Sequence, residues 1–310
     1  GYYDFIQFLF HTQWMAIKEY ANEKNISIVG DAPIFLAWDS ADVWSHQELF
    51  MLDSKGYPTE VAGVPPDYFS ETGQLWGNPL YNWSKHTATG YEWWIERIKY
   101  QFTLTDFLRI DHFRGFARYW AVPYGEETAI NGEWKPAPGI NFFTQLQANL
   151  GYDLPIIAED LGEIDDSVIE LRDKFNLPGM KILQFAFENP EENDFLPHNY
   201  TRNCVCYTGT HDNDTTLGWY QKAYEASKDK LRRYFSTDAS DICWVMIRAC
   251  FSSVANMAVV PMQDVLKLDS WARLNTPGVG EGNWAWRFED KDMDTKLEER
   301  LFETAKLYGR

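Results

Sequence analysis

The chain has 310 residues, of which 45% are hydrophobic and 24% charged, enough to form a sizeable core. Its formal net charge of −18 disfavours nucleic acid and anionic membranes as partners, so neutral or cationic ligands remain. We find no signal-peptide pattern and no apolar run of membrane length. The four cysteines do not have the spacing of a metal site, so we expect them to be reduced and buried in a cytoplasmic protein.

Aromatic residues make up 16% of the chain and include 14 tryptophans. We expect most of them in the core. Tryptophan in polar loops rich in glycine and asparagine exceeds what a core needs, however, and flat exposed rings suit the faces of sugars.

Helical and strand patterns alternate along the chain. Periodic apolar residues predict helices at 5–23, 91–102, 141–150, 165–175, 229–236, 240–254 and 292–308. Short apolar runs predict strands at 25–29, 107–110, 155–158, 181–187, 203–208 and 257–262. We expect residues 54–83 and 121–140 to form long loops, because glycine and proline recur in both.

This alternation indicates an α/β fold in which helices cover parallel strands. Polar residues follow five of the six predicted strands, which is where (β/α) barrels carry their active sites. A doubly wound sheet also binds ligands at these ends, but the glycine-rich phosphate loop typical of that fold is missing. We therefore predict a TIM barrel that forms one catalytic domain over residues 1–310.

Three acidic residues stand at the ends of three predicted strands: Asp111, Glu159 and Asp212. Arg109 and Asp111 lie two residues apart and so on one face of a strand, where the guanidinium keeps the carboxylate ionised. An ionised, oriented carboxylate can act as a nucleophile. An ion pair that merely closes the strand is the structural alternative.

Glu159 follows the apolar run Ile156-Ile-Ala158 and precedes Asp160. Desolvation and a like charge should raise its pKa and suit it to be a general acid and later a base. Two such carboxyls are the minimal machinery of a glycosidase. Asp212 with His211 would then hold sugar hydroxyls. The structural alternatives are that Glu159 is a charge at the start of a helix and that His211 is a structural histidine.

The loop at 54–83 carries a segment, 63–79, whose side chains suit a ligand: Tyr68, Phe69, Gln74 and Trp76. Long loops in compact domains are usually functional. A packed surface loop with buried aromatic rings is the alternative here.

A two-metal hydrolase is a different hypothesis, in which Asp31, Asp111, His112 and Asp212 would bind the metal. Histidine is scarce, however, with six in all, and no His-x-x-x-His or His-x-Asp pattern occurs. We therefore expect no metal and no cofactor.

Several long motifs resemble the 4-α-glucanotransferases of glycoside hydrolase family 77, also called amylomaltases or disproportionating enzymes. They cover nearly the whole chain: Gly30-Asp-Ala-Pro-Ile-Phe, Gly63-Val-Pro-Pro-Asp-Tyr-Phe-Ser-Glu-Thr-Gly, Arg109-Ile-Asp-His-Phe-Arg-Gly, Ala158-Glu-Asp-Leu-Gly, Tyr207-Thr-Gly-Thr-His-Asp-Asn-Asp-Thr and Gly282-Asn-Trp-Ala-Trp-Arg. The resemblance implies a retaining (β/α)8-barrel enzyme that transfers α-1,4-glucan segments between maltodextrins (EC 2.4.1.25). Its donors are α-1,4-glucans and its acceptors glucose or maltodextrins.

The resemblance also implies roles for individual residues. It implies Asp111 as nucleophile, Glu159 as acid/base and Asp212 as transition-state stabiliser. The substrate-binding positions it implies are Asp31, Arg109, His211 and Asn283, together with Tyr68, Phe69, Gln74 and Trp76 in a lid loop over the glucan.

By the family's pattern, two barrel strands precede the one that ends near Asp31, and we do not find them in this chain. We expect strands 3–8 here, and we regard the missing N-terminal segment as a candidate requirement for activity. A plain α-glucan hydrolase and an inactive glucan-binding fragment remain as alternatives to the transferase. Sequence alone does not separate them, although a water-excluding lid favours transfer.

Overall fold

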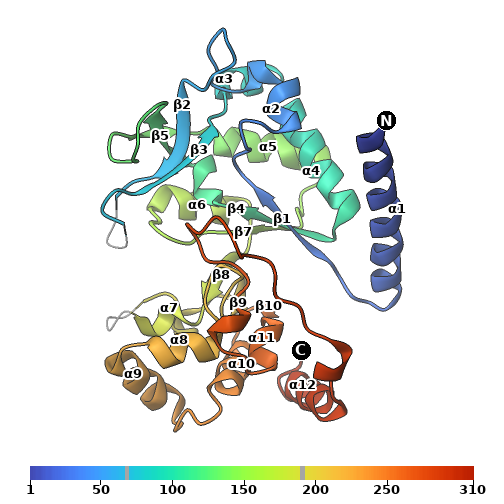
Figure 1. Cartoon of the computed structure of the whole chain (residues 1–310), viewed down its shortest axis with the longest axis vertical. Coiled ribbons are helices and arrows are strands. Elements are labelled where there is room, and N and C mark those ends of the chain that lie inside the picture. Colours follow the sequence, from blue (N-terminus) through green and yellow to red (C-terminus); the bar gives the residue numbers. More distant parts are fainter. Residues whose placement is uncertain (67–69, 189–192) are drawn as a thin grey trace. The chain divides into compact units, whose positions relative to one another are not determined.

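The computed structural model describes residues 1–66, 70–188 and 193–310 (Figure 1). The chain divides into two compact units, Gly1–Pro178 and Gly179–Arg310, and each is described by itself.

Unit 1 combines helices with a parallel and an antiparallel sheet. Its helices are α1 Tyr2–Glu23, α2 Ala41–Ser45, α3 Trp83–Ala88, α4 Glu92–Leu104, α5 Gly139–Leu150 and α6 Asp166–Lys174. Its strands are β1 Val29–Pro33, β2 Glu60–Val64, β3 Gln74–Pro79, β4 Phe107–Asp111, β5 Arg118–Pro123, β6 Glu133–Pro136 and β7 Ile156–Ala158, with short 3-10 helices at Gln47–Leu49 and Phe113–Phe116.

The parallel sheet of unit 1 has the order β1-β4-β7, and these strands run side by side in Figure 1. Asp31 of β1 pairs with Arg109 of β4, and Ile110 of β4 pairs with Ala158 of β7. Leu108, Ile110, Ile156 and Ala158 are at most 2% exposed, which explains why these strands read as unbroken apolar runs. Asp111 and Glu159 therefore lie at the carboxyl ends of neighbouring strands, as predicted.

The antiparallel sheet, in the order β3-β2-β5-β6, corrects the expected loops at 54–83 and 121–140. A shift in register between Val61 and Gly63 breaks the two-residue alternation by which a strand is recognised. Gly63 is needed there, because a Cβ atom would lie 2.5 Å from the carbonyl oxygen of Gln74. The region predicted as a loop is thus a hairpin that carries Gln74 and Trp76 on β3.

Aromatic rings make up a large part of the core of unit 1. Phe116 stacks on Phe142 with ring centroids 5.0 Å apart, and Trp94 meets both rings edge-on. All three side chains are at most 2% exposed, which agrees with the expectation that many tryptophans serve packing.

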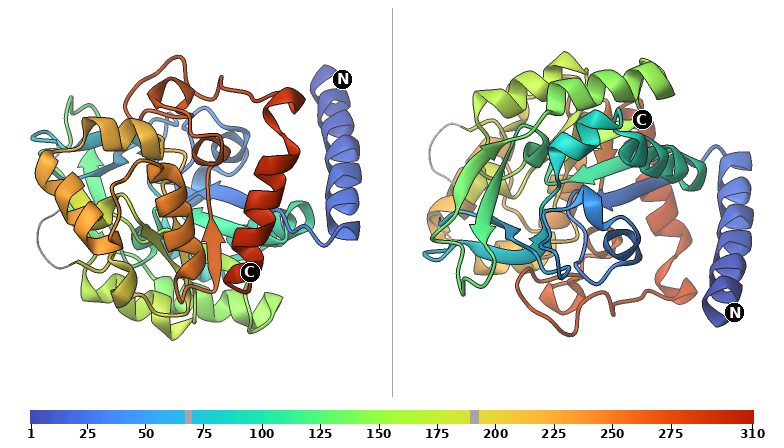
Figure 2. Two further views of the ribbon diagram at one scale, coloured as in Figure 1. Left: turned by 90° about the horizontal axis from the view of Figure 1, so that it is seen from below. Right: turned by 90° about the horizontal axis from the view of Figure 1, so that it is seen from above.

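Helix α1 lies at the side of unit 1 in both views of Figure 2. It contributes no buried residue. Three of its side chains contact the segment that ends α4 and begins β4, and the first of these contacts is the bond from Asn22 Nδ2 to Asp106 Oδ2 at 3.0 Å. The Trp14 Nε1–H donates to the carbonyl oxygen of Leu104 at 2.8 Å, and Lys18 lies 3.5 Å from a carboxylate oxygen of Asp106.

Unit 2 has one parallel sheet, in the order β10-β9-β8, and six helices among its described residues. Its strands are β8 Gly179–Ile182, β9 Cys204–Tyr207 and β10 Met257–Val259. Its helices are α7 Phe185–Glu188, α8 Thr216–Lys222, α9 Glu225–Phe235, α10 Ile242–Ser252, α11 Met262–Val265 and α12 Thr295–Leu307, with 3-10 helices at Pro197–Asn199, Ser270–Ala272 and Asp290–Asp292. All four cysteines are free and buried, as expected.

The predicted strand at 181–187 is wrong in its second half. The ladder ends when the Leu183 N–H donates to the carbonyl oxygen of Tyr207 at 2.9 Å, and α7 begins two residues later. The run 181–187 is apolar enough to fit a buried strand or a buried helix, so periodicity could not locate the change.

The α/β class with parallel strands is confirmed, and β1, β4, β7, β8, β9 and β10 are the six strands expected from the sequence. The strand predicted at 25–29 lies instead at Val29–Pro33, so Asp31 is part of the strand rather than beyond its end. The single domain stays a prediction, and so does the assignment of these six strands to positions 3–8 of a (β/α)8 barrel. Among the described residues no helix is both long and apolar enough to span a membrane.

Candidate active site

Arg109 links two carboxylates at the end of the parallel sheet in unit 1. Its Nη1 donates to both oxygens of Asp31, at 2.7 and 2.6 Å, and its Nη2 donates to Asp111 Oδ1 at 2.9 Å. The pairing of Asp31 with Arg109 across β1 and β4 brings the first partner into reach, and the two-residue spacing along β4 brings the second. Burial opposes the charge on the guanidinium, but Asp31 and Asp111 outweigh it and raise the pKa of Arg109.

Asp111 is the last residue of β4, and its side chain is 45% exposed. The guanidinium of Arg109 forms an ion pair with it at 2.9 Å. An oriented and accessible carboxylate of this kind can attack an electrophilic carbon.

Glu159 follows β7 and is buried, with 9% of the residue exposed. Its Oε2 accepts from the His112 N–H at 2.6 Å, and its Oε1 accepts from the Leu161 N–H at 2.9 Å. Burial raises its pKa to about 7, and the charge of Asp111 adds to this effect, whereas Arg109 and the two N–H groups oppose it. Glu159 can therefore carry a proton near neutral pH while its neighbour Asp111 is paired with a cation.

His112 directly follows Asp111 in the chain, and its backbone N–H donates to the carboxyl of Glu159. It adopts a left-handed conformation with φ 51°, which turns the chain after β4 and points its N–H at Glu159. Burial lowers the pKa of its imidazole to about 3, with a further contribution from Arg114, so the ring is neutral. Its Nε2 has no hydrogen-bond partner among the described residues.

Trp76 of β3 covers this turn. Its ring meets the imidazole of His112 edge-on, with centroids 4.7 Å apart, and lies 6.4 Å from the ring of Phe35. The Trp76 Nε1–H donates to Gln74 Oε1 at 3.1 Å, so these two predicted lid residues support each other. The other two, Tyr68 and Phe69, lie outside the described residues.

His211 and Asp212 follow β9 in unit 2, and the loop at 273–284 fixes them. Asn275 Nδ2 donates to Asp212 Oδ1 at 2.5 Å, and Arg273 Nη2 donates to the carbonyl oxygen of Asp212 at 2.6 Å. The imidazole of His211 lies 5.1 Å from the ring of Trp284 and 3.4 Å from Asp212 Oδ2. A second carboxylate at a strand end is thus held in one orientation, with 42% of its side chain exposed.

Sequence reasoning missed Arg273, Asn275 and Trp284 as supports of this pair. No local pattern marks them, because the bond from Asn275 to Asp212 joins positions 63 residues apart. For Asn283, which was predicted to bind substrate, the structure gives local partners. Its Oδ1 accepts from the Thr276 N–H at 3.0 Å and its Nδ2 donates to the carbonyl oxygen of Val279 at 2.7 Å.

The metal hypothesis finds no cluster in the part of the chain that the structure describes, where no three His, Cys, Asp or Glu side chains could hold one ion together. Of its four residues, Asp31 and Asp111 bind the guanidinium of Arg109.

Comparison with known proteins gives consistent results. The profile of the family described as 4-alpha-glucanotransferase, glycoside hydrolase family 77, matches residues 1–293. The 4-alpha-glucanotransferase of Synechocystis is 52% identical over 312 residues, which cover 100% of this chain and 62% of the relative. The 4-alpha-glucanotransferase of Thermus thermophilus is 49% identical over 309 residues, which cover 97% of this chain and 62% of the relative.

A solved structure, the amylomaltase from Streptococcus agalactiae in complex with acarbose, aligns with a TM-score of 0.95 at 41% identity. The alignment covers 98% of this chain and 62% of that one. The chain therefore spans about 62% of the length of the relatives it matches.

Proposed function

Since this chain belongs to the 4-alpha-glucanotransferase family, we propose that it carries the catalytic carboxyls of a retaining α-1,4-glucan transferase. The observation that carries the proposal is the contrast between two carboxyls on neighbouring strands. Asp111 is ion-paired with Arg109, whereas burial gives Glu159 a pKa of about 7. A retaining glycosidase needs one ionised nucleophile and one protonated acid that lie close together.

In the first step, Asp111 attacks the anomeric carbon of a glucan and forms a covalent ester. Glu159 gives its proton to the glycosidic oxygen as the bond to the leaving sugar breaks. In the second step, Glu159 takes the proton from the hydroxyl of an incoming sugar, which attacks the same carbon and releases Asp111. Two inversions restore the α configuration. The separation of about 5–5.5 Å between the two carboxyls that retention requires is part of this proposal.

The other predicted residues take supporting roles in the proposal. Asp31 and Arg109 orient Asp111, and the resemblance assigns Asp212 and His211 to the sugar ring as it distorts. Trp76 and Gln74 would contact the glucan from the hairpin. The assignment of the six parallel strands to positions 3–8 of a (β/α)8 barrel belongs to the same proposal and is supported by the similarity to the amylomaltase from Streptococcus agalactiae, of which this chain covers 62%.

Incubation with maltotriose tests this function. Transfer yields glucose together with a ladder of longer maltodextrins, and we expect Asp111→Ala to abolish the ladder while oligosaccharide binding stays within about tenfold. Glucose and maltose without a ladder would identify a hydrolase. No product at all, or an Asp111→Ala variant that keeps a tenth of the parent rate, would contradict the proposal.

A further inference from the structure

Three exposed aromatic side chains gather in unit 1, away from the catalytic carboxyls in sequence. They are Trp38, Tyr57 and Tyr124, which we call the outer aromatic patch. The ring of Trp38 lies 5.2 Å from that of Tyr57 and 6.1 Å from that of Tyr124, and the two tyrosine rings are 6.5 Å apart. Each side chain is 39–47% exposed, so the cluster presents ring faces to solvent rather than filling the core.

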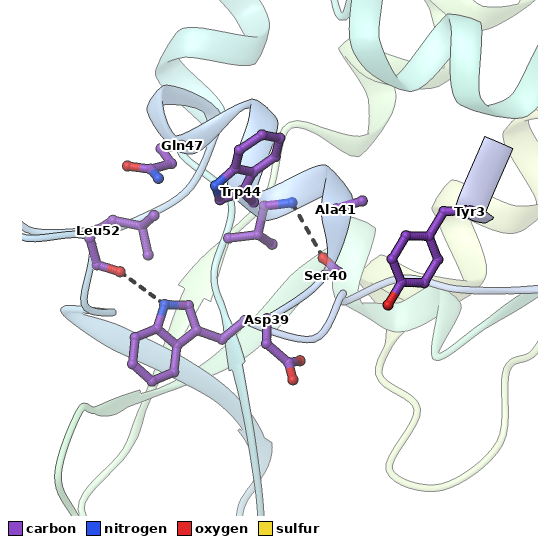
Figure 3. Close-up of a pocket in the computed structure, with 10 residues that line it drawn as sticks. Tyr3, Asp39, Ser40, Ala41, Trp44, Gln47 and Leu52 are labelled. Carbon is purple, nitrogen blue, oxygen red and sulfur yellow. Dashed lines mark hydrogen bonds between the residues drawn. The ribbon is translucent and has the colours of Figure 1, made fainter. Parts of the chain in front are cut away.

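A cavity of about 760 Å³ adjoins Trp38 (Figure 3). Figure 3 shows Asp39 and Ser40 on the segment that leads into α2 and Trp44 within α2, with Tyr3 reaching from α1. The Trp44 side chain is 76% exposed. The cavity thus combines large apolar rings with a carboxylate, a hydroxyl and the amide of Gln47.

The rings of the patch are held in place before any ligand arrives. The Trp38 Nε1–H donates to the carbonyl oxygen of Gly56 at 2.9 Å. Asp53 Oδ1 accepts from the N–H groups of Lys55 and Tyr57, at 2.7 and 3.0 Å, and so fixes the turn before Tyr57. Prior ordering lowers the entropic cost of binding a ligand across these rings.

We propose that the outer aromatic patch and the adjoining cavity bind a segment of α-1,4-glucan. Flat rings pack against the apolar faces of a sugar, and the spacing of the three centroids is on the scale of one pyranose ring. Asp39 and Gln47 can bind hydroxyl groups. Asp39 and the chain's net charge of −18 disfavour phosphorylated or other anionic ligands, which leaves an uncharged saccharide.

The patch begins near a residue that contacts Trp76 of the hairpin. Phe35, whose ring lies 6.4 Å from Trp76, precedes Trp38 by three residues. Three residues extend at most about 11 Å, so the Cα atom of Trp38 lies within about that distance of the Cα atom of Phe35. Its effect should therefore appear with long glucans that extend beyond the bond to be cleaved. The choice of α-1,4-glucan as ligand rests on the proposed function.

Affinity electrophoresis of the full chain through gels containing amylopectin tests the patch without turnover. We expect Trp38→Ala to weaken retardation at least fivefold in apparent dissociation constant. Trp38→Phe keeps a ring and should stay within about twofold of the parent. Tyr124→Ala provides a second variant should Trp38→Ala unfold. The matched control is Trp271→Ala, which removes a tryptophan that is 69% exposed in unit 2 and should leave retardation unchanged.

The proposed glucan binding by the patch would be wrong if the parent chain were not retarded. It would also be wrong if the folded Trp38→Ala and Tyr124→Ala variants were retarded like the parent. The same holds if Trp271→Ala loses retardation as strongly as Trp38→Ala. The outcome is separate from the maltotriose assay. If retardation depends on Trp38 but the chain makes no maltodextrin ladder, the proposed transferase function is wrong and the proposal of a glucan-binding patch is supported.

Discussion

The two parallel sheets place a buried carboxylate in strikingly different surroundings. Glu159, after β7 in unit 1, accepts two backbone hydrogen bonds and has the carboxylate of Asp111 as a charged neighbour. Asp264, in α11 just after β10 in unit 2, accepts from the hydroxyl groups of Thr208 and Thr216, at 2.5 and 2.7 Å, and from the Thr216 N–H at 2.7 Å. Burial raises the pKa of both carboxyls.

The comparison shows that a raised pKa alone does not mark a catalytic acid. Asp264 is fully buried, and its oxygens are occupied by groups of its own unit, which connect β9, α8 and α11. Glu159 instead has a partly exposed carboxylate, that of Asp111, beside it at the end of the neighbouring strand. We therefore propose a chemical role for Glu159 and a structural role for Asp264.

Replacement of the proposed acid should have the largest effect on activity. We expect Glu159→Gln to lower kcat for maltotriose by about 10²–10⁴-fold, because a positioned general acid contributes that much. Glu163→Gln, an exposed neighbour in the same loop, is the matched control and should stay within twofold. Comparable losses in both variants would show that the loop, and not the carboxyl of Glu159, matters.

Replacement of Asp264 should act on stability. Asp264→Ala leaves two hydroxyls and one N–H without their buried acceptor and should cost about 3 kcal/mol in the free energy of unfolding, measured with urea. Asp229→Ala, which removes only an exposed ion pair with Arg233, should cost at most about 0.5 kcal/mol. If Asp264→Ala kept its stability and lost kcat, the assignment of the two carboxyls would be reversed.

The pH dependence of stability gives a smaller effect with a defined sign. A carboxyl with a raised pKa keeps its proton in the folded state after the unfolded chain has lost it, so stability falls as pH rises through this window. For Glu159 the window runs from the ordinary value of 4.5 to about 7. Relative to Glu159→Gln, the parent should lose up to about 1.4 kcal/mol per pH unit there and none above it. If the parent instead gained stability relative to the variant as the pH rose from 4.5 to about 7, the pKa of Glu159 would not be raised.

The smallest effect should come from the hairpin over the site. Trp76→Ala removes the ring that covers His112, and we expect it to raise hydrolysis relative to transfer severalfold by weakening acceptor binding. Measuring the dextrin ladder and the reducing ends released from maltotriose gives this ratio. Equal reduction of both products would mean that Trp76 serves packing alone.

The sequence was sufficient to predict the parallel strands and the acids at their ends, because buried parallel strands appear as continuous apolar runs followed directly by polar residues. The direction of the pKa shift of Glu159 was also predicted correctly, because the apolar run from Ile156 to Ala158 indicates burial. The like charge that adds to the shift comes from Asp111 and not, as expected, from Asp160, which pairs with Arg172. These features depend on neighbours in the chain.

The features that the sequence did not predict depend on distant pairs. The bonds from Arg109 to Asp31 join positions 78 residues apart, and that from Asn275 to Asp212 spans 63. The β2–β3 hairpin was missed because its strands are short, rich in glycine and proline, and offset by a bulge at Gly63. The end of β8 was missed because one apolar run serves a strand and then a helix.

The central claim is that Asp111 is the nucleophile and Glu159 the acid/base of a double displacement. Trapping the covalent intermediate tests it most directly, with a 5-fluoro-α-glucosyl fluoride whose anomeric C–F bond breaks as an ester to the enzyme forms and fluoride leaves. The account predicts one added fluoroglucosyl group on the proteolytic peptide that contains Asp111, and no adduct in Asp111→Ala. An adduct on any other carboxylate, or the same adduct in Asp111→Ala, would contradict it.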